Sequence, residues 1–203
     1  MARPQAEDYD ERKQSILDTA ARVFADGGYH KASISQIADA CGMSKSLIYH
    51  YFKSKQSMLY HAMLDHVIEL DKLAQEVMAM DISAEERLKK IIRRYLIVYE
   101  NTVPQHHLMI NELKSLTAEQ KAEVVGLQNS VVHAFADLAN EISPLPFEKH
   151  KAKTAISMLM LGMVNWTYIW FKPDGPVSSE QLAAIITKMF IDGLKGLTED
   201  VFV

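Results

Sequence analysis

The residues best suited to chemistry lie between Ser44 and Lys55, where lysine, serine, tyrosine and histidine occur without an acidic residue. Lysine can pair with a phosphate, and hydroxyl and imidazole groups can donate hydrogen bonds to phosphates or base edges. With polar residues just before this segment, they form a candidate nucleic-acid-binding set of Ser33, Ser35, Gln36, Lys45, Ser46, Tyr49, His50 and Lys55.

Two short helices joined by a tight turn would present these residues. Ser33 is a favourable N-cap, and apolar residues follow it at helical spacing. Gly42 supplies the positive φ that a tight turn needs, and Ser44 can cap a second helix. A helix-turn-helix of this kind can place its second helix in the major groove of DNA. The alternative is an ordinary helical hairpin whose lysines are solvated.

Longer helices are predicted on both sides of this pair. From Tyr9, apolar residues recur at the helical period until Gly27-Gly28, which predicts a first helix that braces the two short ones, after a loose polar segment 1–8. Ser54 caps a helix expected to reach about Met80. Because no flexible linker separates this helix from the short ones, movement of its far end would swing the second short helix.

The rest of the chain is also predicted to be helical, so the fold class is all-α with about nine helices. Helix starts are predicted near Ser83, Pro104, Thr117 and Ser178. The segment Thr154–Phe171 carries no charge and approaches the length of a membrane-spanning helix, but polar residues interrupt it. We interpret it as a buried helix that, with the last helix, pairs with the same helices of a second copy in a homodimer. No membrane association is expected.

Four ordered motifs occur in the N-terminal quarter, at 24–29, 33–38, 42–44 and 48–55. Together they resemble the DNA-binding domain of tetracycline-repressor (TetR) type transcriptional regulators. The resemblance implies a homodimeric repressor with two recognition helices one DNA turn apart on a palindromic double-stranded operator, released when a small molecule binds. It also implies that the last two helices form the dimer interface. Ser35 stands where the family often has a longer base-reading side chain, which leaves the operator sequence open.

The resemblance further implies a small-molecule pocket enclosed by the fourth, fifth, seventh and eighth helices. Methionines would give it an adaptable apolar wall, tryptophan a flat surface, and polar or cationic side chains its anchors. The candidate pocket residues are Met63, Arg93, Met109, His133, Met158, Gly162, Asn165 and Trp166. The alternative is that these residues are ordinary core and solvated surface.

The closing pattern Gly162–Trp166, Trp170-Phe171 and Pro173–Pro176 suggests a class of effector. It is similar to a subset of these regulators that respond to acyl- or aryl-CoA thioesters. The implied effector is therefore a CoA thioester or a hydrophobic acid. Arg93-Arg94 or Lys89-Lys90 could supply charge for the phosphates of CoA, or could face solvent.

Composition limits the remaining possibilities. The 203 residues carry a net charge of −4. Eight Lys and Arg against seven Asp and Glu give +1 over residues 1–55, and fourteen against nineteen give −5 over the rest, so basicity is local to the second short helix. One cysteine and no signal peptide favour the cytoplasm. We divide the chain into a DNA-binding domain, 1–55, and a ligand-binding and dimerisation domain, 56–203.

No enzyme is predicted. The sequence has no phosphate-binding glycine motif and no nucleophile elbow, so no catalytic residue or cofactor can be assigned. His61 and His66 are five residues apart, which does not place them on one helix face, and His106-His107 has no ligand cluster beside it, so no metal site is predicted. Two other classes are a metal-dependent all-α enzyme and a helical protein-interaction adaptor that kept the fold without DNA binding.

Overall fold

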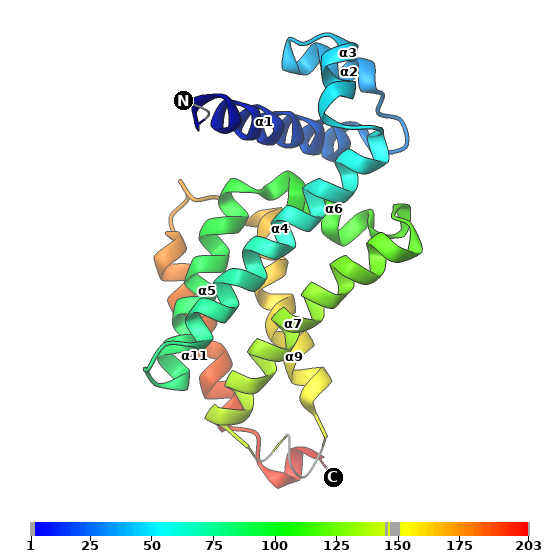
Figure 1. Cartoon of the computed structure of the whole chain (residues 1–203). Coiled ribbons are helices and arrows are strands. Elements are labelled where there is room, and N and C mark those ends of the chain that lie inside the picture. The colour runs from blue at the N-terminus through cyan, green and yellow to red at the C-terminus, as the bar shows by residue number, and fades with distance from the viewer. Residues whose placement is uncertain (1–2, 145, 147–150, 203) are drawn as a thin grey trace. The chain divides into compact units, whose positions relative to one another are not determined.

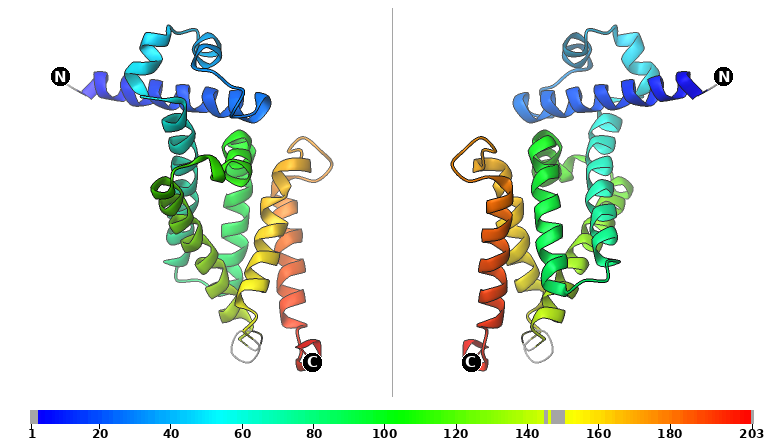
Figure 2. Two further views of the ribbon diagram at one scale, coloured as in Figure 1. Left: turned by 90° about the vertical axis from the view of Figure 1, so that its right-hand side faces the viewer. Right: turned by 90° about the vertical axis from the view of Figure 1, so that its left-hand side faces the viewer.

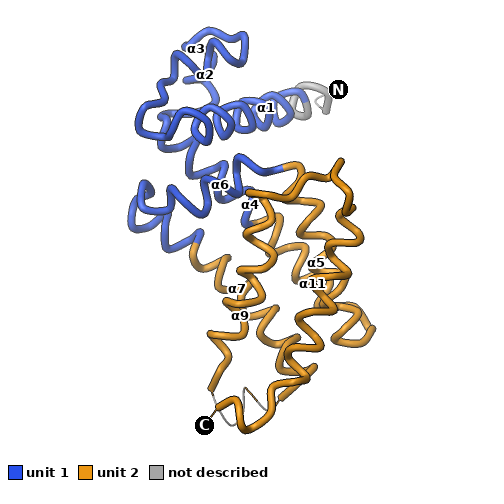
Figure 3. The backbone as a smooth tube through the Cα atoms, turned by 180° about the vertical axis from the view of Figure 1, so that it is seen from behind, with its two compact units in different colours: residues 1–67, 102–124 blue, residues 68–101, 125–203 orange. Residues whose placement is uncertain are grey.

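The computed structural model describes residues 3–144, 146 and 151–202, and helices dominate that part of the chain (Figure 1). No strand occurs among these residues, and the all-α prediction is confirmed. The chain divides into two compact units, coloured separately in Figure 3: residues 1–67 with 102–124, and residues 68–101 with 125–203. The predicted domain boundary after residue 55 lies inside the first unit. Two helices contribute to both units: α4 (Lys55–Met78) and α7 (Ala118–Ile142).

The first unit is built around one long helix. Besides its parts of α4 and α7, it contains α1 (Arg3–Gly27), α2 (Ile34–Cys41), α3 (Lys45–Tyr51), α6 (Val103–Asn111) and the 3₁₀ turn η1 (Leu113–Ser115). The apolar stripe of α1 is buried, including Ile16, Leu17 and Phe24. It packs against α2 and α6, so the first helix braces the short pair as predicted.

The start of α1 differs from the prediction. Segment 1–8 was expected to be loose, yet α1 begins at Arg3. Pro4 is tolerated in a first helical turn because its missing N–H would lack an intrahelical partner there. Gln, Ala and Glu follow it and favour helix, so a helix held by its buried stripe extends backwards through this polar segment. Tyr9 is therefore placed within a helix.

Polar contacts also join α6 to the rest of the first unit. The amide of Gln105 donates a hydrogen bond to the Asp18 carboxylate on α1, with 2.9 Å between Nε2 and Oδ1. His66 on α4 and His106 on α6 are both buried, and their Nε2 and Nδ1 atoms lie 3.2 Å apart. The helix α6 is thus packed in the same unit as the predicted DNA-contacting helices.

The second unit is a helical bundle. With its parts of α4 and α7, it contains α5 (Ala84–Asn101), α9 (Lys153–Asn165), α10 (Thr167–Trp170), α11 (Ser179–Lys195) and the 3₁₀ turn η2 (Glu199–Phe202). Figure 2 shows α9 and α11 side by side, and both contact α5. Capping fixes the starts: Ser83 and Glu86 exchange hydrogen bonds before α5, and Ser178 and Gln181 do so at α11.

The uncharged segment Thr154–Phe171 is not one helix. It divides into α9 and α10 at Trp166, whose N–H donates back to the carbonyl of Gly162. Among the described residues, no helix has the length and apolar character that crossing a membrane requires.

Candidate nucleic-acid interface and effector site

The turn between α2 and α3 is fixed by its caps, as the sequence predicts. The hydroxyl of Ser33 accepts from the N–H of Gln36, and the Gln36 side chain accepts from the N–H of Ser33. Gly42 ends α2 with φ +64°, a conformation that glycine adopts without steric cost. Ser44 then caps α3 by accepting from the N–H of Leu47. These bonds set the angle at which α3 leaves the turn.

One side of α3 is free for contact with a ligand. Its buried residue is Ile48, which anchors the helix to the first unit. Four candidate residues, Lys45, Ser46, Tyr49 and His50, are exposed along this helix, and the Tyr49 side chain is 54% exposed. The structure therefore presents a cation, two hydroxyl groups and an imidazole on one short helix that has no acidic residue.

The other four candidate residues have different surroundings. Ser33 and Gln36 are exposed and form the cap of α2, and Ser35 is half-buried on α2. Lys55, the last predicted DNA contact, is engaged within the first unit. Its ammonium donates to the carbonyl oxygens of Tyr29, His30 and Ala32 at 2.8, 3.2 and 2.8 Å.

The Lys55 ammonium also lies 4.6 Å from the centre of the Tyr29 ring. Because three carbonyls and a ring face already surround this charge, Lys55 is better described as a residue that stabilises the loop between α1 and α2 than as a phosphate contact. The sequence could not show this, because the carbonyls lie more than twenty positions away.

Two of the eight candidate pocket residues lie in the first unit and six in the second. Met63 and Met109 are core residues of the first unit. In the second unit, Arg93 forms an ion pair with Glu180 at 2.5 Å, and His133 is exposed on α7. Gly162 is exposed on α9, and the Met158 and Trp166 side chains are 57% and 60% exposed.

Asn165 belongs to a polar pair inside the second unit. Its side-chain carbonyl accepts a hydrogen bond from the hydroxyl of Tyr99, with 2.7 Å between the oxygens. Tyr99 is buried, and that burial raises the pKa of its phenol, so the hydroxyl stays a neutral donor at physiological pH. Tyr95, one turn earlier on α5, donates to the carbonyl of Leu70 at 2.8 Å. The candidate pocket residues predicted from sequence did not include these tyrosines.

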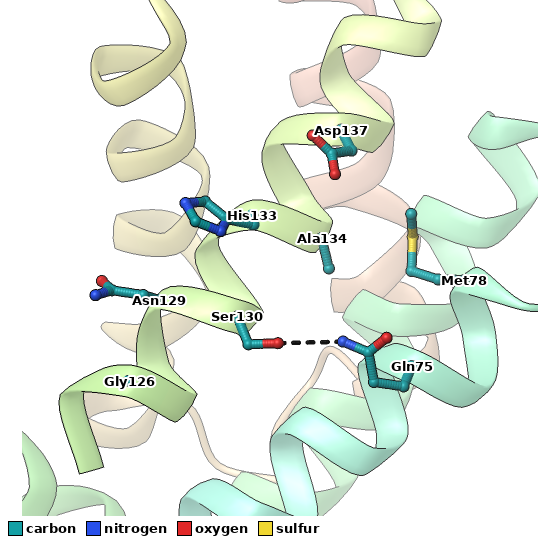
Figure 4. Close-up of a pocket in the computed structure, with 8 residues that line it drawn as sticks. All are labelled: Gln75, Met78, Gly126, Asn129, Ser130, His133, Ala134 and Asp137. Atoms are coloured by element: carbon teal, nitrogen blue, oxygen red, sulfur yellow. Dashed lines mark hydrogen bonds between the residues drawn. The ribbon is translucent and has the colours of Figure 1, made fainter. Parts of the chain in front are cut away.

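A polar groove lies between α4 and α7 in the second unit (Figure 4). Its volume is about 330 Å³, and the side chain of Gln75 donates to the Ser130 hydroxyl at 3.2 Å. His133 is the candidate pocket residue that lines it. The lining residues are Gln75, Met78, Gly126, Asn129, Ser130, His133, Ala134 and Asp137.

Large apolar side chains are exposed on the last helices. We call this the apolar face; it consists of Met158, Leu159, Trp166, Ile169, Trp170, Ile185 and Met189, each between 46% and 69% exposed. The spacing of four between Ile185 and Met189 places this pair on one stripe of α11. An apolar surface of this extent indicates a protein interface.

Two family models match the chain. Residues 16–62 match bacterial regulatory proteins of the tetR family, and residues 81–194 match the tetracyclin repressor-like C-terminal domain. The first match spans the helix-turn-helix, and the second alone covers more than half of the chain.

Individual relatives agree with the family models. A TetR-family transcriptional regulator from Bordetella parapertussis is 32% identical with a TM-score of 0.85, over 92% of this chain and 97% of that one. AibR, solved in complex with isovaleryl coenzyme A and operator DNA, is 28% identical with a TM-score of 0.75, over 88% and 97%. The transcriptional activator FasR from Mycolicibacterium smegmatis is 26% identical over 84% of this chain and 77% of its own length. This chain therefore belongs to the TetR family of DNA-binding transcriptional regulators, which are not enzymes.

Proposed function

We propose that this regulator is a repressor that binds a palindromic operator as a homodimer and is released by a CoA thioester or a related hydrophobic acid. The observation that carries the DNA-binding part is the exposed surface of α3, where Lys45, Ser46, Tyr49 and His50 are available and acidic residues are absent. The functional division into residues 1–55 and 56–203, and a cytoplasmic location beside bacterial DNA, are parts of the same proposal.

Dimer formation follows from the apolar face. Seven exposed apolar side chains on α9, α10 and α11 would be covered by the same elements of a second copy, which is how an isologous interface forms. A two-fold dimer presents two copies of α3, and an operator read in this way has two half-sites about one helical turn apart.

The DNA proposal predicts selection of a palindrome from random duplexes by the purified protein. Lys45→Ala should weaken binding to the selected duplex about tenfold or more, because it removes the cation from the exposed surface of α3. Lys55→Met is the matched variant. It should leave the salt dependence unchanged but destabilise the protein by about 2 kcal/mol, since three carbonyls lose a charged donor. Fluorescence anisotropy and thermal melting measure the two effects.

Selection of no palindrome by the wild-type protein would contradict the DNA proposal and favour the protein-interaction adaptor. A shallower salt dependence for Lys55→Met, with unchanged stability, would restore Lys55 to the set of phosphate contacts.

The effector class is supported by the likeness to AibR, whose solved complex contains isovaleryl coenzyme A. In this chain, we propose that the hydroxyl of Tyr99 donates to the carbonyl or carboxylate of the effector in exchange for Asn165. A neutral, buried phenol suits this task because it donates without bringing a charge into an apolar interior. Arg93 and Arg94 each face a carboxylate, Glu180 and Glu76, which the phosphates of CoA would displace.

A thermal-shift comparison of isovaleryl-CoA, free CoA and free isovalerate tests the effector class. A bound thioester at a hundred times its dissociation constant should stabilise the protein by about 2.7 kcal/mol and lower its operator affinity. Tyr99→Phe keeps the ring and removes the donor, and should weaken thioester binding about fivefold, the effect of one net hydrogen bond. No stabilisation by any of the three compounds would contradict the proposed effector class. Equal thioester affinity in Tyr99→Phe and wild type would contradict the proposed role of the Tyr99 hydroxyl.

A further inference from the structure

Three aromatic rings connect the beginning of α1 to the end of α3. The rings of Tyr9 and Tyr51 are stacked, with centres 4.7 Å apart and planes inclined by 28°. The Tyr9 ring also meets the edge of His50 at 6.2 Å and 84°, and His50 meets Tyr51 at 5.3 Å and 88°. All three pairs have the separations and angles at which aromatic rings attract one another.

This cluster lies at the end of a helix that depends on its neighbours. α3 has seven residues, too few for a helix to be stable alone in water. Ser44 caps the first turn of α3, and Ile48 anchors its buried side. Phe52, the residue after its last turn, is 1% exposed. Lys13 of α1 lies 6.0 Å from the centre of the Phe52 ring, so α1 contacts the end of α3 at two successive residues.

The Tyr9 ring is not itself a core residue. Its side chain is 40% exposed, and its contacts are to the half-buried Tyr51 and the exposed His50. A core residue of this size would be buried on all sides. The position of Tyr9 is instead that of a brace against the last turn of α3, beside the residues that we expect to contact DNA.

We infer that Tyr9 is a positioning residue for operator recognition. By stacking on Tyr51 and meeting His50 edge-on, it holds the last turn of α3 at the angle at which Tyr49 and His50 reach the same base pairs in both half-sites. The inference rests on the proposed DNA binding. It assigns a role in recognition to the polar beginning of the chain, outside the two short helices.

Substitution of Tyr9 separates this role from a direct contact. Tyr9→Ala removes the ring, whereas Tyr9→Phe keeps the stack and removes only the hydroxyl. Loss of the stack should weaken binding to the selected palindrome about three- to tenfold for each copy of α3, and Tyr9→Phe should stay within about twofold of wild type. Affinity for a random duplex should change little in either variant, because it depends on total charge.

The measurements are fluorescence anisotropy with the selected palindrome and with a random duplex, on full-length protein. Ser15→Ala, at another exposed position of α1, is the matched control. The His50 ring resonances, followed by NMR, should shift in Tyr9→Ala and not in Tyr9→Phe, because the neighbouring ring shields them. Tyr9→Leu replaces Tyr9→Ala if the alanine variant melts at a much lower temperature.

Each outcome of these measurements supports or overturns the positioning role of Tyr9. Equal loss in Tyr9→Phe and Tyr9→Ala would show that the hydroxyl contacts DNA and would overturn the positioning role. Wild-type affinity in Tyr9→Ala would also overturn it while leaving the proposed function intact. If the wild-type protein selects no palindrome, the proposed function fails, and this inference fails with it.

Discussion

Replacing Met189 with aspartate is expected to yield a monomer that has lost measurable binding to the operator. Met189 is 64% exposed on α11 and belongs to the apolar face. A two-fold interface contains the substituted residue of both copies. Each unpaired carboxylate taken out of water there costs several kcal/mol. With two such charges at the interface, the dimer should dissociate at micromolar concentration.

Loss of DNA binding should follow from geometry. A dimer holds its second recognition helix at a high effective concentration near the second half-site, which is worth about 10²- to 10⁴-fold in affinity. A monomer has no such advantage. Sedimentation velocity measures the first effect, and fluorescence anisotropy with the selected palindrome measures the second.

The matched control is Ile97→Asp. Ile97 is also an exposed apolar residue, 43% accessible, but it lies on α5 outside the apolar face. This variant should remain a dimer and bind the operator as the wild type does, and both variants should keep the wild-type helix content. A dimeric Met189→Asp protein would show that the apolar face of α9 to α11 is not where the two copies meet.

Local chemistry made the helix-turn-helix predictable from sequence. Its caps involve residues three positions apart, such as Ser33 with Gln36 and Ser44 with Leu47, and its turn needs one glycine in a left-handed conformation. Those interactions are complete within the segment from Ser33 to Leu47. The exposed surface of α3 follows from the same local pattern, because burial of Ile48 fixes which side of the helix faces outward.

Long-range contacts were not predictable in this way. Lys55 looks like a phosphate contact in a basic segment, but the carbonyls that surround it belong to the loop before α2. The candidate pocket stays a prediction, because the side of a helix that faces a ligand also depends on long-range packing. The spacing of apolar residues predicts an apolar helix face that includes Met158 and Trp166. It does not show whether that face packs in the core or against a second copy.

The buried pair His66 and His106 is another such contact, forty residues apart in sequence, and it leads to a prediction about acid. Burial, and secondarily the charge of His106, lower the pKa of His66 to about 3 from the usual value of 6.5. The folded protein thus keeps His66 neutral well below the pH at which the unfolded chain takes up its proton. Stability that depends on this difference is complete above pH 6.5 and is lost as the pH falls towards 3.

The expected effect is large. Between pH 6.5 and 3, each pH unit lowers the free energy of unfolding by about 1.4 kcal/mol through this one group, or about 3 kcal/mol by pH 4. The whole free energy of unfolding of a typical domain is about 5–15 kcal/mol. Because α6 and α1 pack in the same unit, loosening this pair should also reduce operator binding as the pH falls.

Urea unfolding at pH 7, 5 and 4 measures the effect in the wild type and in His66→Gln, which keeps a donor near His106 but does not titrate. Carboxylates also weaken the fold in acid, so the informative quantity is the difference between the two proteins. Wild type should lose about 3 kcal/mol more than His66→Gln between pH 7 and pH 4. His133→Gln, at an exposed histidine, should follow the wild type. Equal losses of unfolding free energy in wild type and His66→Gln would contradict this prediction. They would mean that the buried imidazole already takes up its proton in the folded state, because only a group whose pKa differs between the folded and unfolded states makes stability depend on pH.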